Sequence, residues 1–389
     1  MTSTLNVALL GSRFMGKAHS NAWSQAARFF EDLKLSPVLH SVCARDAEAL
    51  ETFRERWGWG RATTRWQSLV NDPEVELVDV ATPNDLHAAP SIAALEAGKH
   101  VACEKPLART LAEADQMRRA ARSAFKKHGA RTFVWFNYRR CPAVAFAWKL
   151  MRAGTLGDVY HVRARYLQSW GGPDTPRTWR FQRSKAGSGA HGDLNAHIVD
   201  MARFLLADEV VEVHGAVART FVRQRPAVDA KRKSDTQKSD VDDCVAFLAS
   251  FAGGATASFE ASRVAHGHLN DNAIEINGSK GSLRFSFEDM NVLELADASL
   301  PSATAGWRRV MCTSAGDHPY VDAWWPDAHL IGYEHGFTNT VADILRVLAG
   351  QRPEVPLADF EDAWRTQAVL EAALQAARER AAVKPARVR

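Results

Sequence analysis

The chain has few cysteines and no long apolar run. Its five cysteines, among 389 residues, are odd in number, scattered, and never spaced as C-x-x-C. This argues against a disulfide framework or a structural zinc and favours reduced thiols in a cytoplasmic setting. No apolar stretch approaches the roughly 20 residues that span a bilayer. The first residues, MTSTLNVALLG, lack a charged start and a cleavage signature, so we expect a first strand there and not a signal peptide.

A strong excess of charge of either sign is also missing. The formal net charge is +4, from 49 Lys and Arg against 45 Asp and Glu, and such a balance gives no sign of a nucleic-acid-binding surface. Hydrophobic residues make up 46% of the chain, which suits a globular protein. The length suits two domains. We therefore expect neither a nucleic-acid partner nor a membrane partner.

Strand-like and helix-like segments alternate over residues 1–138. The apolar runs are NVALL, VLHSVC, VELVDV, KHVAC and RTFVW, and segments with helical periodicity lie between them. This alternation with short connections predicts parallel strands with right-handed crossovers. We predict an α/β fold in which residues 1–138 form a Rossmann-type domain with a doubly wound parallel sheet.

After about residue 140 the pattern changes to alternating, β-rich runs joined by turn residues, from DVYHVRARYL to NVLELAD. These runs predict an α+β domain over 139–389 with a large, mainly antiparallel, open-faced sheet. The helices expected beside it, at 142–153, 193–206, 330–350 and 357–382, are too few to cover both faces. We expect the open face to pack against a second subunit, as a homodimer or homotetramer. Residues 223–240 are polar and predict a long flexible loop.

The segment GSRFMG, residues 11–16, follows the first predicted strand and opens the first predicted helix. It matches the fingerprint G-x-G-x-x-G at Gly11 and Gly16, but Arg13 replaces the middle glycine. Gly11 permits the tight turn, Gly16 lets the helix pack on the strand, and the helix N-terminus offers N–H donors to a phosphate. A side chain at position 13 crowds the pyrophosphate, yet a guanidinium also pairs with phosphate. The loop therefore fits a dinucleotide, and a turn without a ligand is the alternative.

Two further motifs carry titratable side chains. ATPNDLHA (81–88) and CEKP (103–106) end the third and fourth predicted strands, at the edge where doubly wound sheets bind ligands. Lys105 is there either a site residue or a solvated lysine. Asp193 and His197 are four residues apart near the start of a predicted helix and share one of its faces. The aspartate would orient the imidazole, and an ordinary surface pair is the alternative.

These motifs together resemble the Gfo/Idh/MocA oxidoreductase family. The matching segments occur in the family's order over essentially the whole chain: GSRFMGKAHSNAW, ATPNDLHA, AALEAGKHVACEKPLA, FNYRR, WRF and GDLNAHIVDMA. The stretch from YLQSWGGPD to IVDMAR is similar to enzymes of the levoglucosan dehydrogenase type, which oxidise the carbon-3 hydroxyl of an anhydro-sugar. The resemblance implies hydride transfer between NAD or NADP and a ring hydroxyl of a sugar, anhydro-sugar or cyclic polyol.

The resemblance also implies roles for individual residues. Three are expected to be catalytic: His197 as the general base for the hydroxyl proton, Lys105 as the stabiliser of the oxygen, and Asp193 as the orienting group. The cofactor is expected at Gly11, Arg13, Phe14, Met15, Gly16, Arg45, Thr82, Asn84, His87, Glu104, Lys105, Asn137, Trp179 and Arg180. The substrate is expected at Tyr138, Arg139, Gln168, Trp170 and Arg263, with Trp179 as a further candidate, although each aromatic also suits core packing. No metal site is expected, because His266 and His268 lack a third ligand.

Two questions stay open at this point. Position 44, where an acid often binds the ribose 2′-hydroxyl, is alanine, and Arg45 follows it. This favours a 2′-phosphate and hence NADP, whereas the levoglucosan-type resemblance favours NAD. The function is also open to a redox glycosidase, which oxidises carbon 3 transiently so that a glycosidic bond eliminates, and to a non-catalytic dinucleotide-binding sensor. The presence of Lys105, Asp193 and His197 speaks against the sensor.

Overall fold

The computed structural model describes residues 3–232 and 234–387, which separate into two compact units. The first unit comprises the described residues of Met1–Arg140 and of Tyr320–Trp364. The second comprises those of Cys141–Pro319 and of Arg365–Arg389. Residues 320–364 thus pack in the first unit. The boundary at residue 138 that we expect from the sequence assigns them to the second domain.

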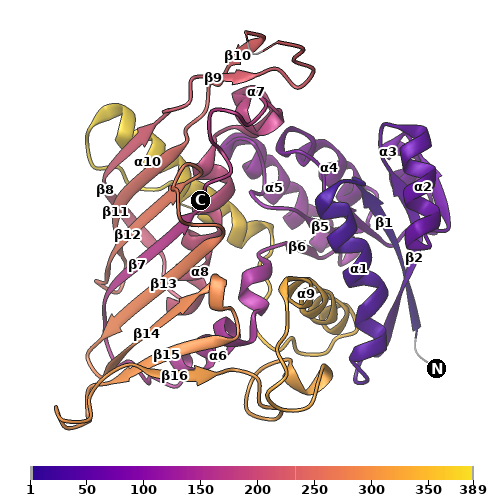
Figure 1. The fold of residues 1–389 in the computed structure, drawn as a ribbon. Helices are drawn as coiled ribbons and strands as arrows, with labels where there is room; N and C mark the ends of the chain where they lie inside the picture. The colour runs from indigo at the N-terminus through magenta and orange to yellow at the C-terminus, as the bar shows by residue number, and fades with distance from the viewer. Residues whose placement is uncertain (1–2, 233, 388–389) are drawn as a thin grey trace. The chain divides into compact units, whose positions relative to one another are not determined.

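A sheet of six parallel strands forms the centre of the first unit, within the part of the chain that is described (Figure 1). Its order, β3-β2-β1-β4-β5-β6, is that of two mononucleotide-binding halves. Val7, Val80 and Val101 have no exposed surface, because the sheet is covered on both faces. The predicted Rossmann-type sheet is confirmed, and β3 is an addition to it. The strands are β1 (Ser3–Leu10), β2 (Leu35–Cys43), β3 (Arg61–Thr63), β4 (Leu77–Val80), β5 (His100–Cys103) and β6 (Thr132–Val134).

Helices from both ends of the chain pack in this unit. The helix α9, from the carboxyl-terminal part, lies against α1. Arg346 on α9 binds Asp32 at 2.9 Å, and the rings of Phe29 and Trp324 lie 4.5 Å apart. These contacts explain why residues 320–364 belong here. The helices are α1 (Phe14–Phe29), α2 (Ala47–Trp57), α3 (Trp66–Asn71), η1 (Asn84–Leu86), α4 (Ala88–Glu96), α5 (Leu111–His128), η2 (Asn137–Arg140), η6 (Val321–Ala323) and α9 (Tyr333–Leu348).

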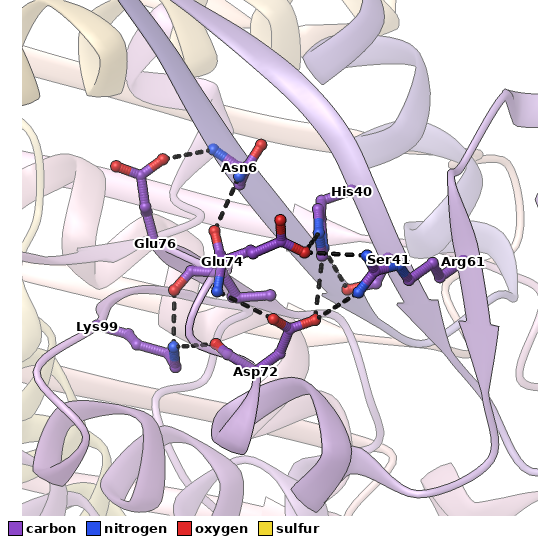
Figure 2. A network of polar contacts seen from close by, with 9 residues as sticks. Asn6, His40, Ser41, Arg61, Asp72, Glu74, Glu76 and Lys99 are labelled. Atoms are coloured by element: carbon purple, nitrogen blue, oxygen red, sulfur yellow. Dashed lines mark hydrogen bonds and ion pairs between the residues drawn. The ribbon is translucent and has the colours of Figure 1, made fainter.

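A network of polar side chains stabilises the edge of this sheet at which the strands begin (Figure 2). Lys99 donates to two backbone carbonyl oxygens of the loop before β4, both at 2.7 Å. Arg61 donates to Asp72 at 3.2 Å and to Glu74 at 2.9 Å. The potential ligand atoms of His40, Asp72 and Glu74 lie within 4.8 Å of one another. Ion pairing accounts for this cluster, because Arg61 already donates to both carboxylates.

The second unit contains, among the described residues, an eight-stranded sheet in the order β16-β15-β14-β13-β7-β12-β11-β8. The pair β7–β12 is parallel, and the other pairs are antiparallel. The predicted, mainly antiparallel sheet is confirmed. Its strands are β7 (Val159–Leu167), β8 (Val210–Arg219), β11 (Cys244–Phe251), β12 (Thr256–Ser262), β13 (Asp271–Gly278), β14 (Gly281–Ser286), β15 (Val292–Asp297) and β16 (Arg308–Met311).

One face of this sheet carries the helices of the unit. The helix α8 (Ala196–Leu206) contacts β7 and β13, and α6 (Pro142–Arg152) contacts β14 and β15. On the opposite face, Val217 and Leu248 are 52% and 58% exposed. No helix among the described residues has the length and apolarity needed to cross a membrane. The other helical segments are η3 (Trp179–Phe181), α7 (Arg183–Ala186), η4 (His191–Asn195), η5 (Phe287–Asp289) and α10 (Phe360–Glu379), which spans the division at residue 364.

The prediction of a long flexible loop at 223–240 is wrong in part. This segment contains a short antiparallel pair, β9 (Gln224–Pro226) and β10 (Thr236–Lys238). Arg225 within it has no exposed surface and donates to Asp243 at 2.8 Å. Its guanidinium also donates to the carbonyl oxygens of Gly171 and Gly172. A buried charge is tolerated when it is paired and hydrogen-bonded in this way, and a polar composition does not reveal such partners.

We expect Asp243→Asn to destabilise the second unit by about 3–5 kcal/mol, because it leaves the buried Arg225 charge without its partner. The measurement is urea unfolding followed by fluorescence and by hydrogen exchange in the second unit. Glu371→Gln is the matched control, since it breaks the exposed pair between Arg378 and Glu371 and should cost less than about 1 kcal/mol. Equal effects of the two changes would contradict the importance of the buried pair.

Candidate active site

The turn between β1 and α1 has the geometry of a dinucleotide-binding loop. Gly11 has a φ of +110°, and a Cβ atom there would lie 2.4 Å from the carbonyl oxygen of Ala81. A Cβ atom on Gly16 would lie 2.2 Å from the carbonyl oxygen of Gly11. Only glycine fits either position without a backbone shift. The turn lies where the order of strands reverses between β1 and β4, the usual ligand position in such sheets.

The start of α1 suits an anion. Its N-cap residue is Arg13, which is exposed and makes no side-chain cap hydrogen bond, so the free N–H groups of the first turn can meet a phosphate. Gly11 N–H donates to the carbonyl of Cys43 at the end of β2, and the exposed Arg45 follows two residues later. Asp46 next to it accepts the N–H of Ala49 as the cap of α2. Both arginines thus lie at the edge where the strands end, and these residues fit a pyrophosphate and its ribose.

The predicted cofactor residues after β4 form a braced loop. Thr82 Oγ donates to the carbonyl of Leu86, and Asn84 in η1 is buried. His87 is fully buried, and its ring nitrogens lie 2.9 Å from the carbonyl oxygen of Thr82 and 3.0 Å from that of Pro106. Burial lowers the pKa of His87. This histidine therefore connects the loop after β4 to the loop that carries Lys105.

The remaining predicted residues of the first unit differ in exposure. Phe14 is 61% exposed, and its ring is stacked on that of Tyr333 with an interplanar angle of 4°. Met15 is half-buried. In η2, Arg139 is buried and donates to Asp362 at 2.7 Å, so an ion pair already engages the guanidinium expected to contact substrate. Asn137 and Tyr138 are also buried in η2.

A buried network lies beneath Lys105. His19 on α1 places its Nδ1 3.0 Å from Asp79 on β4 and its Nε2 3.1 Å from Glu104 at the end of β5. Glu104 also accepts the backbone N–H of Lys105 at 3.0 Å. The indole N–H groups of Trp23 and Trp135 donate to Asp79 at 2.8 and 2.9 Å. The sequence analysis did not predict that His19 contacts the segment CEKP, although His19 lies only three positions after Gly16 of the fingerprint.

The protonation of His19 follows from these neighbours. Burial alone would lower its pKa, but the carboxylates of Asp79 and Glu104 outweigh burial and raise the pKa to about 9. His19 is therefore an imidazolium at neutral pH. One cation between two carboxylates leaves a single net negative charge beside the half-buried Lys105.

In the second unit, Asp193 and His197 lie at the start of the α8 segment, but not on one regular helix. Asp193 belongs to the π-helical turn η4 (His191–Asn195), whereas His197 belongs to α8. Asp193 therefore lies in a turn that is wider than an α-helical turn, and His197 lies in the α-helix that continues it. Asp242 receives the backbone N–H groups of Gly189 and His191 and so holds this turn. Short π turns of this kind frequently occur at functional sites.

Arg263 is the residue that binds Asp193. Its guanidinium has almost no exposed surface and donates to the Asp193 carboxylate at 2.9 Å. A second N–H donates to the carbonyl oxygen of Arg180 at 3.3 Å. The Arg180 guanidinium in turn lies 4.6 Å from the centre of the Trp179 ring. Arg263, expected as a substrate contact, thus orients Asp193 and connects it to the segment of Trp179 and Arg180.

Polar side chains from the end of the sheet lie beside His197. The ring of Tyr166 on β7 is 5.8 Å from that of His197. The Tyr166 hydroxyl and the Gln168 amide both donate to the side-chain oxygen of Asn270 at 2.7 Å. The indole N–H of Trp170, which is 40% exposed, donates to Gln168 at 2.6 Å. The sequence analysis named Gln168 and Trp170 as candidate substrate contacts, but it did not name Tyr166 or Asn270. The alternation of residues along β7 and β13 identifies the buried face of each strand, but it does not indicate which polar side chains meet where the strands end.

Comparison with known proteins matches the two parts of the chain to two family descriptions. Residues 5–132 match an oxidoreductase family with an NAD-binding Rossmann fold, and residues 144–284 match the GFO/IDH/MocA C-terminal domain. The levoglucosan dehydrogenase of Pseudarthrobacter phenanthrenivorans is 39% identical over 384 residues, which cover 96% of each chain.

Solved structures agree with these matches. An oxidoreductase domain protein from Kribbella flavida superposes with a TM-score of 0.93 at 48% identity, covering 99% of this chain and 100% of the other. A levoglucosan dehydrogenase in complex with NADH and levoglucosan superposes with a TM-score of 0.92 at 38% identity, again over 99% and 100% of the two chains. Both likenesses extend over the two units.

The charge on His19 makes stability depend on pH. The pKa of His19 is raised from 6.5 to about 9 on folding, so its stabilisation is complete below pH 6.5 and is lost as pH rises through about 9. Over that interval we expect the free energy of unfolding to fall by about 3 kcal/mol in total from this group. Urea unfolding at a series of pH values measures it, with His19→Gln as the comparison. A parent and a variant with parallel pH dependence would contradict the assignment.

Proposed function

The chain belongs to the Gfo/Idh/MocA family of oxidoreductases, and from this premise we propose that it is an NAD(P)-dependent dehydrogenase of a ring hydroxyl. The substrate class is a sugar, anhydro-sugar or cyclic polyol, with carbon 3 as the position oxidised. The observation that carries the proposal is the pair of prepared sites: the glycine turn at Gly11 and Gly16 in one unit, and in the other Asp193, which Arg263 holds, followed by His197 four residues later. The structure of the related levoglucosan dehydrogenase in complex with NADH and levoglucosan supports the same substrate class.

We propose the following roles for the titratable groups. The nicotinamide, when bound, supplies the hydride acceptor. His197 takes the proton of the substrate hydroxyl, since a neutral imidazole is a base near pH 7. Lys105 donates to the same oxygen and stabilises its developing negative charge. Asp193, held by Arg263, fixes the position of the hydroxyl or of the base.

The cofactor contacts remain those expected from the motifs. The glycine turn and α1 would receive the pyrophosphate, and Arg45 would lie near the adenine ribose. Trp179 and Arg180 are further cofactor contacts that the resemblance implies. NADH in the related structure supports NAD, whereas Ala44 and Arg45 support tolerance of a 2′-phosphate.

The sugar-binding groups are proposed from the end of the second unit's sheet. Trp170 offers an aromatic face to the C–H face of a pyranose, and Gln168 offers an amide to its hydroxyls. Asn270 orders Gln168, so it belongs to the same proposed site. Residues 1–138 would then bind the cofactor, and residues 139–389 would bind the substrate and form the contacts between subunits. The five cysteines, which form no disulfide among the described residues, support a cytoplasmic location.

The first test of this proposal is loss of turnover. We expect Lys105→Ala and His197→Ala each to lower kcat by at least about a hundredfold, the scale of a positioned acid–base group, while circular dichroism stays unchanged. Lys126→Ala and His161→Ala, which alter exposed or half-buried side chains away from these groups, are the matched controls. Turnover within a few-fold of the parent in either site variant would refute its role. NADH absorbance that accumulates at 340 nm with substrate separates a dehydrogenase from a redox glycosidase and from a sensor.

The second test concerns the cofactor. Arg45→Ala should weaken NADP binding more than NAD binding, by about 1–3 kcal/mol if a charge-assisted hydrogen bond is lost. Calorimetric titration of both cofactors against the parent, Arg13→Gly and Arg45→Ala measures this, with Arg56→Ala on α2 as the control. Equal losses for NAD and NADP would show that Arg45 does not bind the phosphate. Tighter binding by Arg13→Gly would show that Arg13 obstructs the loop.

We also propose that the open sheet face is the subunit interface of a homodimer or homotetramer. Val217 and Leu248 lie exposed on this face, and ion pairs such as Arg163 with Glu275 at 3.2 Å cross it. A mixed apolar and charged surface suits a second copy of the same chain.

Sedimentation at micromolar concentration should therefore show a dimer or tetramer, and Leu248→Glu should shift it toward the monomer, because a buried unpaired charge opposes association. Phe125→Glu, at a 50% exposed position of the first unit, is the control and should leave assembly unchanged. A monomeric parent would contradict the proposed interface.

A further inference from the structure

His19 is in contact with carboxylate oxygens through both of its ring nitrogens. Nδ1 lies 3.1 and 3.0 Å from the two oxygens of Asp79, and Nε2 lies 3.1 Å from Glu104. Neither His19 nor Asp79 has exposed surface, and Glu104 is 5% exposed. This burial separates the contacts from bulk solvent, so the protons are assigned among the three groups.

The number of N–H donors around these groups determines where the protons lie. Asp79 accepts indole N–H groups from Trp23 and Trp135 as well as the contact from His19, so it acts as an acceptor and is ionised. A neutral imidazole carries one N–H and cannot donate to both carboxylates. Two arrangements remain: an imidazolium facing an ionised Glu104, or a neutral His19 that accepts a proton held by Glu104.

The surroundings decide between these arrangements. The other faces of His19 are covered by the rings of Trp135, at 3.9 Å, and Phe337, at 5.8 Å. An aromatic face stabilises a cation. The buried His87 and Cys103, which also interact with Glu104, bring no fixed charge, because burial favours the neutral form of each. Two carboxylates against one imidazole therefore favour the imidazolium.

We propose that His19, as an imidazolium between Asp79 and Glu104, is a positioning residue for Lys105. It keeps Glu104 ionised, and the ionised carboxylate accepts the backbone N–H of Lys105 at 3.0 Å. The turn that carries Lys105 is thereby tied to α1 and, through Asp79, to β4. The effect on turnover rests on the proposed dehydrogenase function, whereas the charge of His19 does not.

Loss of the imidazolium has a defined consequence for this turn. Without it, two buried carboxylates face each other and one of them takes up a proton. A protonated Glu104 is a weaker acceptor for the Lys105 N–H, and the turn is no longer held in one place. Small displacements of a reacting group reduce rates by up to about a hundredfold.

The experiment compares His19→Gln with Trp59→Phe in the full chain. Trp59 donates its indole N–H to Ser20 on α1 at 3.0 Å, so Trp59→Phe removes a buried hydrogen bond to the same helix without changing charge. We expect His19→Gln to lower kcat by about 10- to 100-fold, with the Kd of NADH and the sugar KM within about threefold of the parent. Trp59→Phe should lower only the unfolding midpoint. A folded His19→Gln variant with the parent's kcat would overturn the proposal.

The charge itself is measured by nitrogen-15 NMR of the imidazole in the parent. Both His19 nitrogens should stay protonated up to about pH 9, and a neutral ring at pH 7 would overturn the proposal whatever the activity. If His19→Gln does not fold, Glu104→Gln replaces it: His19 should then titrate at lower pH, and an unchanged titration would contradict the pairing. A parent that oxidises no sugar with NAD or NADP refutes the dehydrogenase function and leaves the His19 result standing.

Discussion

The close approach of Gly16 on α1 to the carbonyl of Gly11, where a Cβ atom would lie only 2.2 Å away, determines where α1 lies on the sheet. Because α1 is held there, His19, three residues further along, reaches Asp79 on β4 and Glu104 at the end of β5. The same placement directs the first turn of α1 to the edge of the sheet at which ligands bind. A side chain at position 16 would move the phosphate site and the support of Lys105 together.

The sequence predicts those parts of the fold that depend on hydrophobic periodicity and on turn residues. The parallel sheet, the fingerprint loop and the mainly antiparallel sheet follow from apolar runs, glycines and alternation. It failed where one distant partner decides the outcome. Arg225 lies in a polar stretch, yet Asp243 makes it a buried residue. The packing of residues 320–364 in the first unit rests on contacts such as Arg346 with Asp32, which no local pattern in the sequence indicates.

The candidate site shows the same division. Spacing and resemblance singled out Lys105, Asp193 and His197, for which we propose the catalytic roles, but not the residues that hold them. His19 supports Lys105 across 86 positions of sequence, and Arg263 supports Asp193 across 70. The π turn His191–Asn195 could not be predicted from the spacing of Asp193 and His197, because the same residue types can form an α-helical turn or a π turn.

The packing of α9 on α1 also bears on how the protein is made. Chains emerge from the ribosome from the N-terminus, and domains generally fold as units as they emerge. The first unit, however, lacks α9 (Tyr333–Leu348) until nearly the whole chain has been synthesised. Phe29 and Phe30, which contact Trp324 in the finished unit, stay uncovered for that time. The cofactor-binding unit is thus the first to begin synthesis, yet its packing is complete only after residues 320–364 have been made.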